Sequence, residues 1–138
     1  MPDVCVTDQP LSLQSLADSV RRPGAGAIVT FQGATRAVDS LEYEAYAEMA
    51  ERKIAAIVAD AIGRHGLEAA TAQHRTGSVP LGEPSVIVAA AAAHRHEAFA
   101  GAREMIDRIK AETPIWKKER SAAGEHWMEG TEAPKKSP

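Results

Sequence analysis

The feature that most restricts the fold is an apolar run between a turn and a charged segment. The run covers residues 85–92 (SVIVAAAA), follows a Gly-Glu-Pro turn at 82–84 and precedes His-Arg-His at 94–96. A continuous apolar run of this length is typical of a strand that is buried on both faces. Its alanine-rich second half is also compatible with a helix, because alanine has the highest helix propensity.

The rest of the chain mixes strand-like and helical spacing, which predicts one α+β domain. Strands are predicted at residues 4–7, 27–31, 41–46 and 68–75, with a C-terminal hairpin of 115–120 and 125–129. Helices are predicted around 10–20, over 47–64 with a stop at Gly66, and around 99–109 before Pro114. Residues 32–36 are predicted to form a polar loop. The domain is expected to cover residues 1–130, and the polar tail 131–138 is expected to be disordered.

The composition narrows the class of function. The 138 residues suffice for one domain, and the net charge of −3 argues against a general nucleic-acid binder. No apolar run approaches the roughly 18 residues that cross a bilayer, and no secretory signal is visible, so a cytoplasmic protein is expected. Cys5 is the single cysteine, which excludes an intrachain disulfide. Much of the 44% hydrophobic content is alanine, so the core is thin and burial at a subunit interface is expected.

Basic residues are concentrated in one part of this acidic chain, residues 94–120. A local basic site suits a small anionic ligand better than a polymer. Arg36 follows a predicted strand, where ligand-binding groups often lie, although a solvated loop arginine is the alternative. His94 and Arg95 follow the apolar run as an anion clamp, and the alternative is an ordinary helix start. His94 and His96 lack metal-ligand spacing, so no metal site is predicted.

Three lysines surround the segment 113–116 (TPIW). Lys110 ends a predicted helix, where the helix dipole alone would also favour a cation. Lys117 and Lys118 alternate faces of a predicted strand, so one of them should point toward the helix end. If Lys110 and Lys117 converge, each cation raises the cost of protonating the other. One lysine could then act as a base or a nucleophile.

Taken in series, these segments resemble one family, the large, catalytic subunit of molybdopterin synthase. The resemblance rests on GAIVTFQG at 26–33 with Arg36, LEYEAY at 41–46, HRTGSVPLGEPSVIVAAAAAHR at 74–95, and PIWKKE at 114–119 preceded by Lys110. Order and approximate spacing agree over about residues 26–128. The loop after Arg36 is shorter here than is usual in the family.

The resemblance implies an α/β hammerhead-type α+β fold, with a mixed or antiparallel sheet and flanking helices, that forms a homodimer. Each subunit is expected to bind a small ubiquitin-like sulfur-carrier subunit whose C-terminal Gly-Gly carries a thiocarboxylate, which gives a heterotetramer. The implied reaction transfers sulfur to cyclic pyranopterin monophosphate (precursor Z) and forms the dithiolene of molybdopterin, in molybdenum cofactor biosynthesis. No cofactor or metal is implied, because the thiocarboxylate is itself the nucleophile.

Carried onto this chain, the resemblance makes Lys110 and Lys117 the catalytic residues of a sulfurtransferase. Arg36, His94 and Arg95 become substrate-binding residues, and the His-Arg pair is expected to reach the pocket from the neighbouring subunit. The main alternative is a non-catalytic docking module that binds the ubiquitin-like carrier but has lost the chemistry with the shortened loop. An unrelated phosphate-binding enzyme is a third hypothesis. The two lysines favour the enzyme, because a docking module has little need of both.

Overall fold

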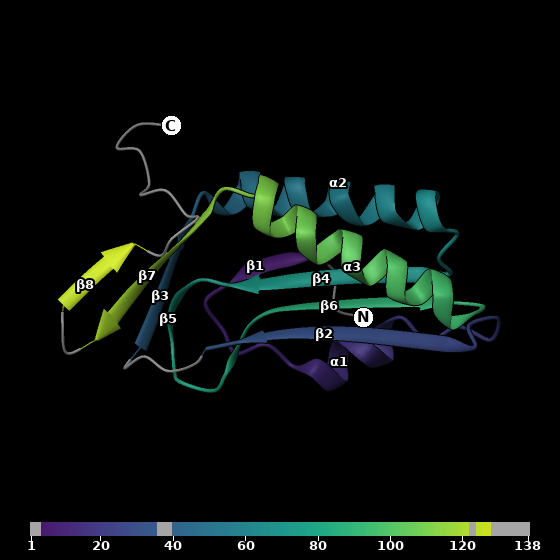
Figure 1. Ribbon diagram of the computed structural model, residues 1–138, viewed down its shortest axis with the longest axis horizontal. Helices are drawn as coiled ribbons and strands as arrows, with labels where there is room; N and C mark the ends of the chain where they lie inside the picture. The colour runs from purple at the N-terminus through teal and green to yellow at the C-terminus, as the bar shows by residue number, and fades with distance from the viewer. Residues whose placement is uncertain (1–3, 36–39, 122–123, 128–138) are drawn as a thin grey trace.

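The computed structural model describes residues 4–35, 40–121 and 124–127, which form two four-stranded sheets and three helices (Figure 1). In chain order the elements are β1 (Cys5–Thr7), α1 (Leu13–Ser19), β2 (Ala27–Ala34), β3 (Ser40–Ala45), α2 (Ala47–His65), β4 (Ala69–Arg75), β5 (Gly77–Val79), β6 (Pro84–Ala92), α3 (Arg95–Glu112), β7 (Ile115–Ser121) and β8 (Gly124–Trp127). This confirms the predicted α+β class in one domain.

The first sheet is built around β6, the apolar run of the sequence. Its strand order is β1-β4-β6-β2, in which β1 and β4 are parallel and the other pairs are antiparallel. In β6, residues 85–92 are all buried, so the run is a strand buried on both faces, as predicted. The alanine-rich half is a strand and not a helix because β2 and β4 pair with it on either side. Tertiary pairing here overrides helix propensity.

The two faces of this sheet are covered by different helices. Val86, Val88 and alternate alanines of β6 pack with α2 and α3 in the larger core cluster. Ile87 and the intervening alanines pack on the other side with Leu16 of α1. Figure 1 shows α2 and α3 side by side over one face and α1 beneath the opposite face. The small alanine side chains therefore fill a three-layer core in which both helix layers lie close to the strand.

The second sheet lies at one end of the first sheet, at the left in Figure 1, and is antiparallel with the order β5-β3-β7-β8. β3 pairs with β7 in a register that puts Tyr43 opposite Lys117. Tyr43 and Val79 are buried there and pack against Ile115. β7 follows α3 directly through Pro114, so the end of α3 and the start of β7 meet where the two sheets adjoin.

The largest differences from the sequence-based prediction concern three elements. β2 continues from Phe31 to Ala34, whereas residues 32–36 had been predicted as a loop, because its backbone pairing with β6 continues to a bulge at Gly33 and Ala34. β5 was not predicted, because it is only three residues long and pairs with β3, which lies more than thirty residues earlier in the chain. α3 begins at Arg95, earlier than around 99, with His94 as its N-cap residue. The predicted tail 131–138 lies outside the described residues.

The core assignment predicts a contrast between two methionines. Met105 of α3 is fully buried in the larger core cluster, whereas Met49 of α2 is 49% exposed. Met105→Ala should lower the free energy of unfolding by about 2–5 kcal/mol, because it leaves a cavity. Met49→Ala should change it by less than about 0.5 kcal/mol. Urea denaturation followed by circular dichroism measures both, and equal losses would contradict the assignment.

Candidate active site

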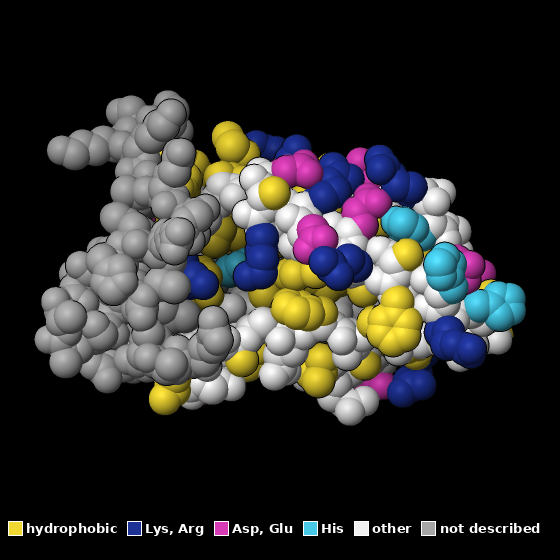
Figure 2. All heavy atoms as spheres, viewed as in Figure 1, with side chains coloured by type: hydrophobic (Ala, Val, Ile, Leu, Met, Phe, Trp, Pro, Cys, Tyr) yellow, Lys and Arg dark blue, Asp and Glu magenta, His cyan; other side chains and the backbone are white. Residues whose placement is uncertain are grey.

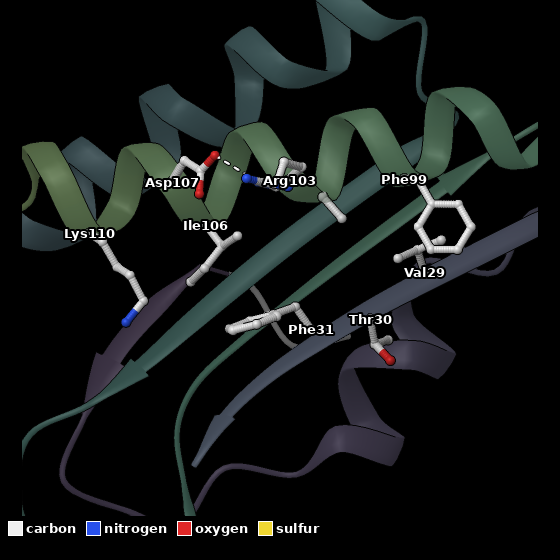
Figure 3. Close-up of a pocket in the computed structure, with 9 residues that line it drawn as sticks. Val29, Thr30, Phe31, Phe99, Arg103, Ile106, Asp107 and Lys110 are labelled. Carbon is white, nitrogen blue, oxygen red and sulfur yellow. Dashed lines mark hydrogen bonds and ion pairs between the residues drawn. The ribbon is translucent and has the colours of Figure 1, made fainter. Parts of the chain in front are cut away.

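The charges of Lys110 and Lys117 both act on one buried histidine, His74. Lys110 lies in the last turn of α3, is exposed, and reaches from the helix toward the sheet (Figure 3). Lys117 is half-buried on β7, opposite Tyr43 of β3. The charges of both ammonium groups act on the imidazole of His74, at the end of β4. Both lysines therefore act on one side chain, His74, for which the sequence predicted no role.

His74 is held in place by one hydrogen bond and one ring contact. Its side chain is 7% exposed, and its Nδ1 lies 2.8 Å from the carbonyl oxygen of Arg75. A carbonyl oxygen can only accept, so Nδ1 carries the proton and donates it. The ring also meets the Tyr43 ring edge-on, with centroids 5.1 Å apart. The imidazole is therefore fixed in both tautomer and orientation.

The surroundings of His74 keep its ring neutral. Burial lowers the pKa of His74 from 6.5 to about 4, and the charges of Lys110 and Lys117 act in the same direction. The hydrogen bond to Arg75 opposes this shift but does not overcome it. Because the pKa lies well below neutral pH, the site holds two lysine side chains around an uncharged ring and not a cluster of three cations.

Tyr43 links this site to the edge of the first sheet. Its hydroxyl donates to Ser85 Oγ at 3.1 Å, and Ser85 Oγ donates to the carbonyl oxygen of Gly33 at 3.2 Å. Burial raises the pKa of Tyr43 above its usual value, and the bond to Ser85 partly offsets the rise. Tyr43 is therefore a neutral hydroxyl that fixes the ring of His74 relative to β2.

The end of β2 is tied to the turn before β6. Thr35 Oγ1 donates to the carbonyl oxygen of Pro80 at 2.8 Å and accepts from the backbone N–H of Gly82 at 2.7 Å. Buried Arg75 donates to Glu83 Oε1 at 2.7 Å in the same turn. These bonds fix the chain at Thr35, immediately before Arg36. Arg36 itself lies outside the described residues, so its substrate-binding role stays a prediction.

A groove of about 450 Å³ runs between α3 and β2, and Lys110 lies at one end of it. Figure 3 shows Phe99 at the other end and Phe31 rising from β2 between them. Phe99 is 62% exposed and Phe31 is 38% exposed. On the molecular surface the groove forms an apolar patch bordered by Lys and Arg side chains (Figure 2). It offers apolar contacts along its length and a cation at its end.

His94 and Arg95 are not brought to the lysines within one chain. They start α3, whereas Lys110 lies near its end, fifteen residues after Arg95. At about 1.5 Å per residue the separation along the helix is about 22 Å. His94, Arg95 and His96 are exposed, and Figure 2 shows histidines gathered at that end of the molecule. The helix-start alternative is thus correct for their local structure, and a role at the lysines requires a second subunit.

His74 is the site residue that sequence reasoning missed. It begins the stretch 74–95 that carried the resemblance, yet no role was predicted for it. The available signal was periodicity: Ala70, Ala72 and His74 alternate along β4 toward the core under α2 and α3. A histidine at an apolar position of a buried strand needs a polar partner there, which marks it for attention.

Neither a metal centre nor a membrane span emerges from the described residues. In residues 4–35, 40–121 and 124–127 no group of three or more His, Cys, Asp or Glu side chains is arranged to hold a metal ion. In the same part of the chain, no helix combines the length and apolarity that a bilayer crossing requires.

The fold and the site define a single-domain α+β protein with a cationic pocket suited to small anions. Residues 6–112, most of the chain, match the family described as MoaE protein. The chain belongs to this family, which confirms the family predicted from the sequence.

Relatives named "Molybdopterin synthase catalytic subunit" are similar over most of the chain. The protein from Oryza sativa subsp. indica is 47% identical over 128 residues, which cover 88% of this chain and 66% of the relative. The chain thus spans about two thirds of the rice relatives' length. The protein from Thermoplasma volcanium is 42% identical over 120 residues, which cover 83% of this chain and 88% of the relative.

Solved structures agree with the fold. The crystal structure of molybdopterin synthase from Staphylococcus aureus has a TM-score of 0.88 at 30% identity and covers 93% of this chain and 98% of that chain. A complex of subunits 1 and 2 of molybdopterin-converting factor from Helicobacter pylori has a TM-score of 0.77 at 18% identity and covers 91% of this chain and 90% of that chain. The latter likeness concerns the fold alone.

The low pKa of His74 predicts a pH dependence of stability. Between pH 6.5 and about 4 the unfolded chain binds a proton at His74 that the folded protein does not. The contribution of His74 to the free energy of unfolding is therefore complete above pH 6.5. As the pH falls below 6.5, the free energy of unfolding decreases by up to about 1.4 kcal/mol per pH unit. Urea denaturation of His74→Gln should show a flatter dependence between pH 6.5 and 5. Exposed His96→Gln is the control, and identical slopes in both variants would refute the prediction.

Proposed function

We propose that this chain is a molybdopterin synthase catalytic subunit. It transfers sulfur from the C-terminal thiocarboxylate of a small ubiquitin-like subunit to cyclic pyranopterin monophosphate and forms the dithiolene of molybdopterin. The observation that carries the proposal is that the charges of Lys110 and Lys117 both act on His74, in a chain of the MoaE family. Lys110 also lies at one end of the groove. Two lysines beside a neutral ring are a site for anions.

The electrostatics fit the reacting groups. The pterin substrate carries a cyclic phosphate and the donor carries a thiocarboxylate, so both partners are anions. Ammonium groups in a partly buried pocket stabilise such anions more strongly than they would in bulk water. Lys110 lies beside the thiocarboxylate carbon and stabilises charge as sulfur attacks, or transfers protons. Lys117 is a second acid/base or a substrate contact.

The C-terminal tail of the carrier would end beside Lys110. A Gly-Gly terminus has no side chains, so it needs little space there. The solved Helicobacter pylori structure is a complex of two subunits of molybdopterin-converting factor, which supports a small-subunit partner. A cytoplasmic location belongs to the same proposal.

A homodimer would complete the site. One homodimer with a carrier subunit bound to each of its two chains makes a heterotetramer. β2 is an edge strand of the first sheet, and the groove beside it exposes Phe31 and Phe99. A two-fold axis near Ala102, midway between Arg95 and Lys110 on α3, would pack two such faces together in antiparallel fashion. Each Lys110 would then meet the partner's Arg95 and the partner's His94. Arg36 and this pair would hold the phosphate and the pterin.

Removal of either lysine should abolish most of the sulfur transfer. The protein is mixed with a thiocarboxylated ubiquitin-like partner and precursor Z, and the dithiolene product is detected as its fluorescent oxidised pterin. Lys110→Ala and Lys117→Ala should each lower the rate on the order of 100-fold, as expected for loss of a charge-stabilising donor. Lys53→Ala, which removes a surface lysine paired with Glu112, is the control and should keep the rate. Tight partner binding without any product from the unsubstituted protein would favour the docking module instead.

Mixed dimers test whether the His-Arg pair acts across the interface. Lys110→Ala and Arg95→Ala chains are each inactive as homodimers under this proposal. After co-refolding, random pairing gives mixed dimers with one intact site each, so about a quarter of the unsubstituted activity should return. If Arg95 acted on the lysines of its own chain, the mixture would stay as inactive as its components.

A further inference from the structure

We propose that Tyr43 is a positioning residue of the candidate active site. Its hydroxyl anchors β3 to β6 and so fixes where Lys117, the residue opposite Tyr43 on β7, lies relative to Lys110. The proposal deepens the proposed sulfur-transfer function and rests on it for the importance of Lys117. It concerns a buried side chain, 8% exposed, that the sulfur-transfer chemistry does not otherwise use.

The hydroxyl of Tyr43 reaches from the second sheet into the first. It donates to Ser85 Oγ on β6 at 3.1 Å, and Ser85 Oγ donates to the carbonyl oxygen of Gly33 on β2 at 3.2 Å. Because a carbonyl oxygen can only accept, both bonds point the same way, and each polarises the other. One side chain of β3 is thus linked through hydrogen bonds to two strands of the first sheet.

The acceptor of this link, Ser85, is itself held in place by the backbone. The register of β2 on β6 passes from Gly33 opposite Val86 to Ala34 opposite Pro84, so Ser85 lies at the bulge. Ser85 is 5% exposed, and a polar group at that depth needs a partner. Its bond to the carbonyl oxygen of Gly33 supplies one. Tyr43 is therefore anchored to a fixed point of the first sheet and not to a surface side chain.

The ring of Tyr43 makes the apolar part of the same contact. It meets His74 of β4 edge-on, with centroids 5.1 Å apart and an angle of 68° between the rings. Among the described side chains, the core cluster of the second sheet consists of buried Tyr43 and Val79, with Ile115 packed against them. Apolar burial is not directional, so a cluster this small fixes an orientation weakly. A hydrogen bond is directional, and the Tyr43 hydroxyl therefore adds the geometry that the cluster lacks.

The link from Tyr43 to Lys117 follows from the register of the second sheet. Tyr43 and Lys117 are directly opposite each other on β3 and β7. Such residues project from the same face of a sheet, with Cβ atoms about 4.5–5.5 Å apart. Lys117 thus leaves β7 on the face by which Tyr43 meets the first sheet. Lys110 belongs to α3, which packs on the first sheet, so the relative position of the two lysines depends on how β3 is held against β6.

Conservative variants isolate the hydroxyl from the ring. Tyr43→Phe removes the donor and keeps the aromatic contacts, Ser85→Ala removes the acceptor, and Ser85→Thr keeps it. Ser19→Ala is the matched control, because it deletes a part-buried hydroxyl that donates to the carbonyl oxygen of Leu16 at 2.8 Å. Ser19 lies on α1, beneath the opposite face of the first sheet (Figure 1).

Trace acetylation of the lysines at constant pH, quantified by peptide mass spectrometry, measures the access of Lys117 relative to Lys53 in the same sample. Lys117 is half-buried, whereas the Lys53 side chain is 42% exposed. Tyr43→Phe and Ser85→Ala should each raise the relative rate at Lys117 about fivefold, as expected for loss of one hydrogen bond. The double variant should match the single ones, because both remove the same bond. Ser85→Thr and Ser19→Ala should leave the rate unchanged. No change in Tyr43→Phe, or multiplied effects in the double variant, would overturn the proposal.

The sulfur-transfer assay tests whether Tyr43 acts through Lys117. Tyr43→Phe should lower the rate about fivefold to tenfold in the unsubstituted protein and again in the Lys110→Ala background. It should have almost no effect in the Lys117→Ala background, because the side chain that it positions is absent. Equal losses in all three backgrounds would indicate a merely structural role and refute the proposal. The acetylation needs neither the carrier subunit nor precursor Z, so its failure is distinct from failure of the proposed function.

Discussion

The structure depends on burial of β6 on both of its faces. Its alanines let α2 and α3 lie close over one side of the sheet while α1 covers the other. α3 ends at Glu112 because Pro114 follows, and the chain then continues directly into β7. Lys110 and Lys117 fall on either side of this junction, so the helix end and the strand start deliver both to the end of β4. The position of the candidate site is thus a consequence of how these elements adjoin.

The electrostatic character of the site follows from the same packing. His74 is buried at the end of β4 and donates Nδ1–H to a backbone carbonyl, so it remains a neutral ring beside two lysines. An apolar groove leads to this point between α3 and β2. The arrangement places two cations around an uncharged ring, which is the property that anionic reactants would use.

Much of the fold could be predicted from the sequence, because it is encoded locally. The apolar run predicted β6, the helical stripe of residues 47–64 predicted α2, and Gly66 ends that helix in the left-handed conformation, with φ 64°. Long-range pairing could not be predicted. β5 is a strand because it pairs with β3, and β2 extends to Ala34 because it pairs with β6. Strand alternation predicted only that Lys117 or Lys118 points toward the helix end, and the catalytic roles of Lys110 and Lys117 stay a prediction. His74 was missed because its importance depends on residues that lie 36 and 43 positions further along the chain.

The most direct test of the central claim is a crystal structure of the assembled protein grown or soaked with inorganic phosphate. The account predicts one phosphate ion per subunit, contacted by Lys110 and Lys117 of one chain and by the partner's Arg95. It also predicts that His74 keeps its bond to the carbonyl oxygen of Arg75. Phosphate bound elsewhere, or a dimer that leaves Arg95 far from the lysines of both chains, would contradict the account.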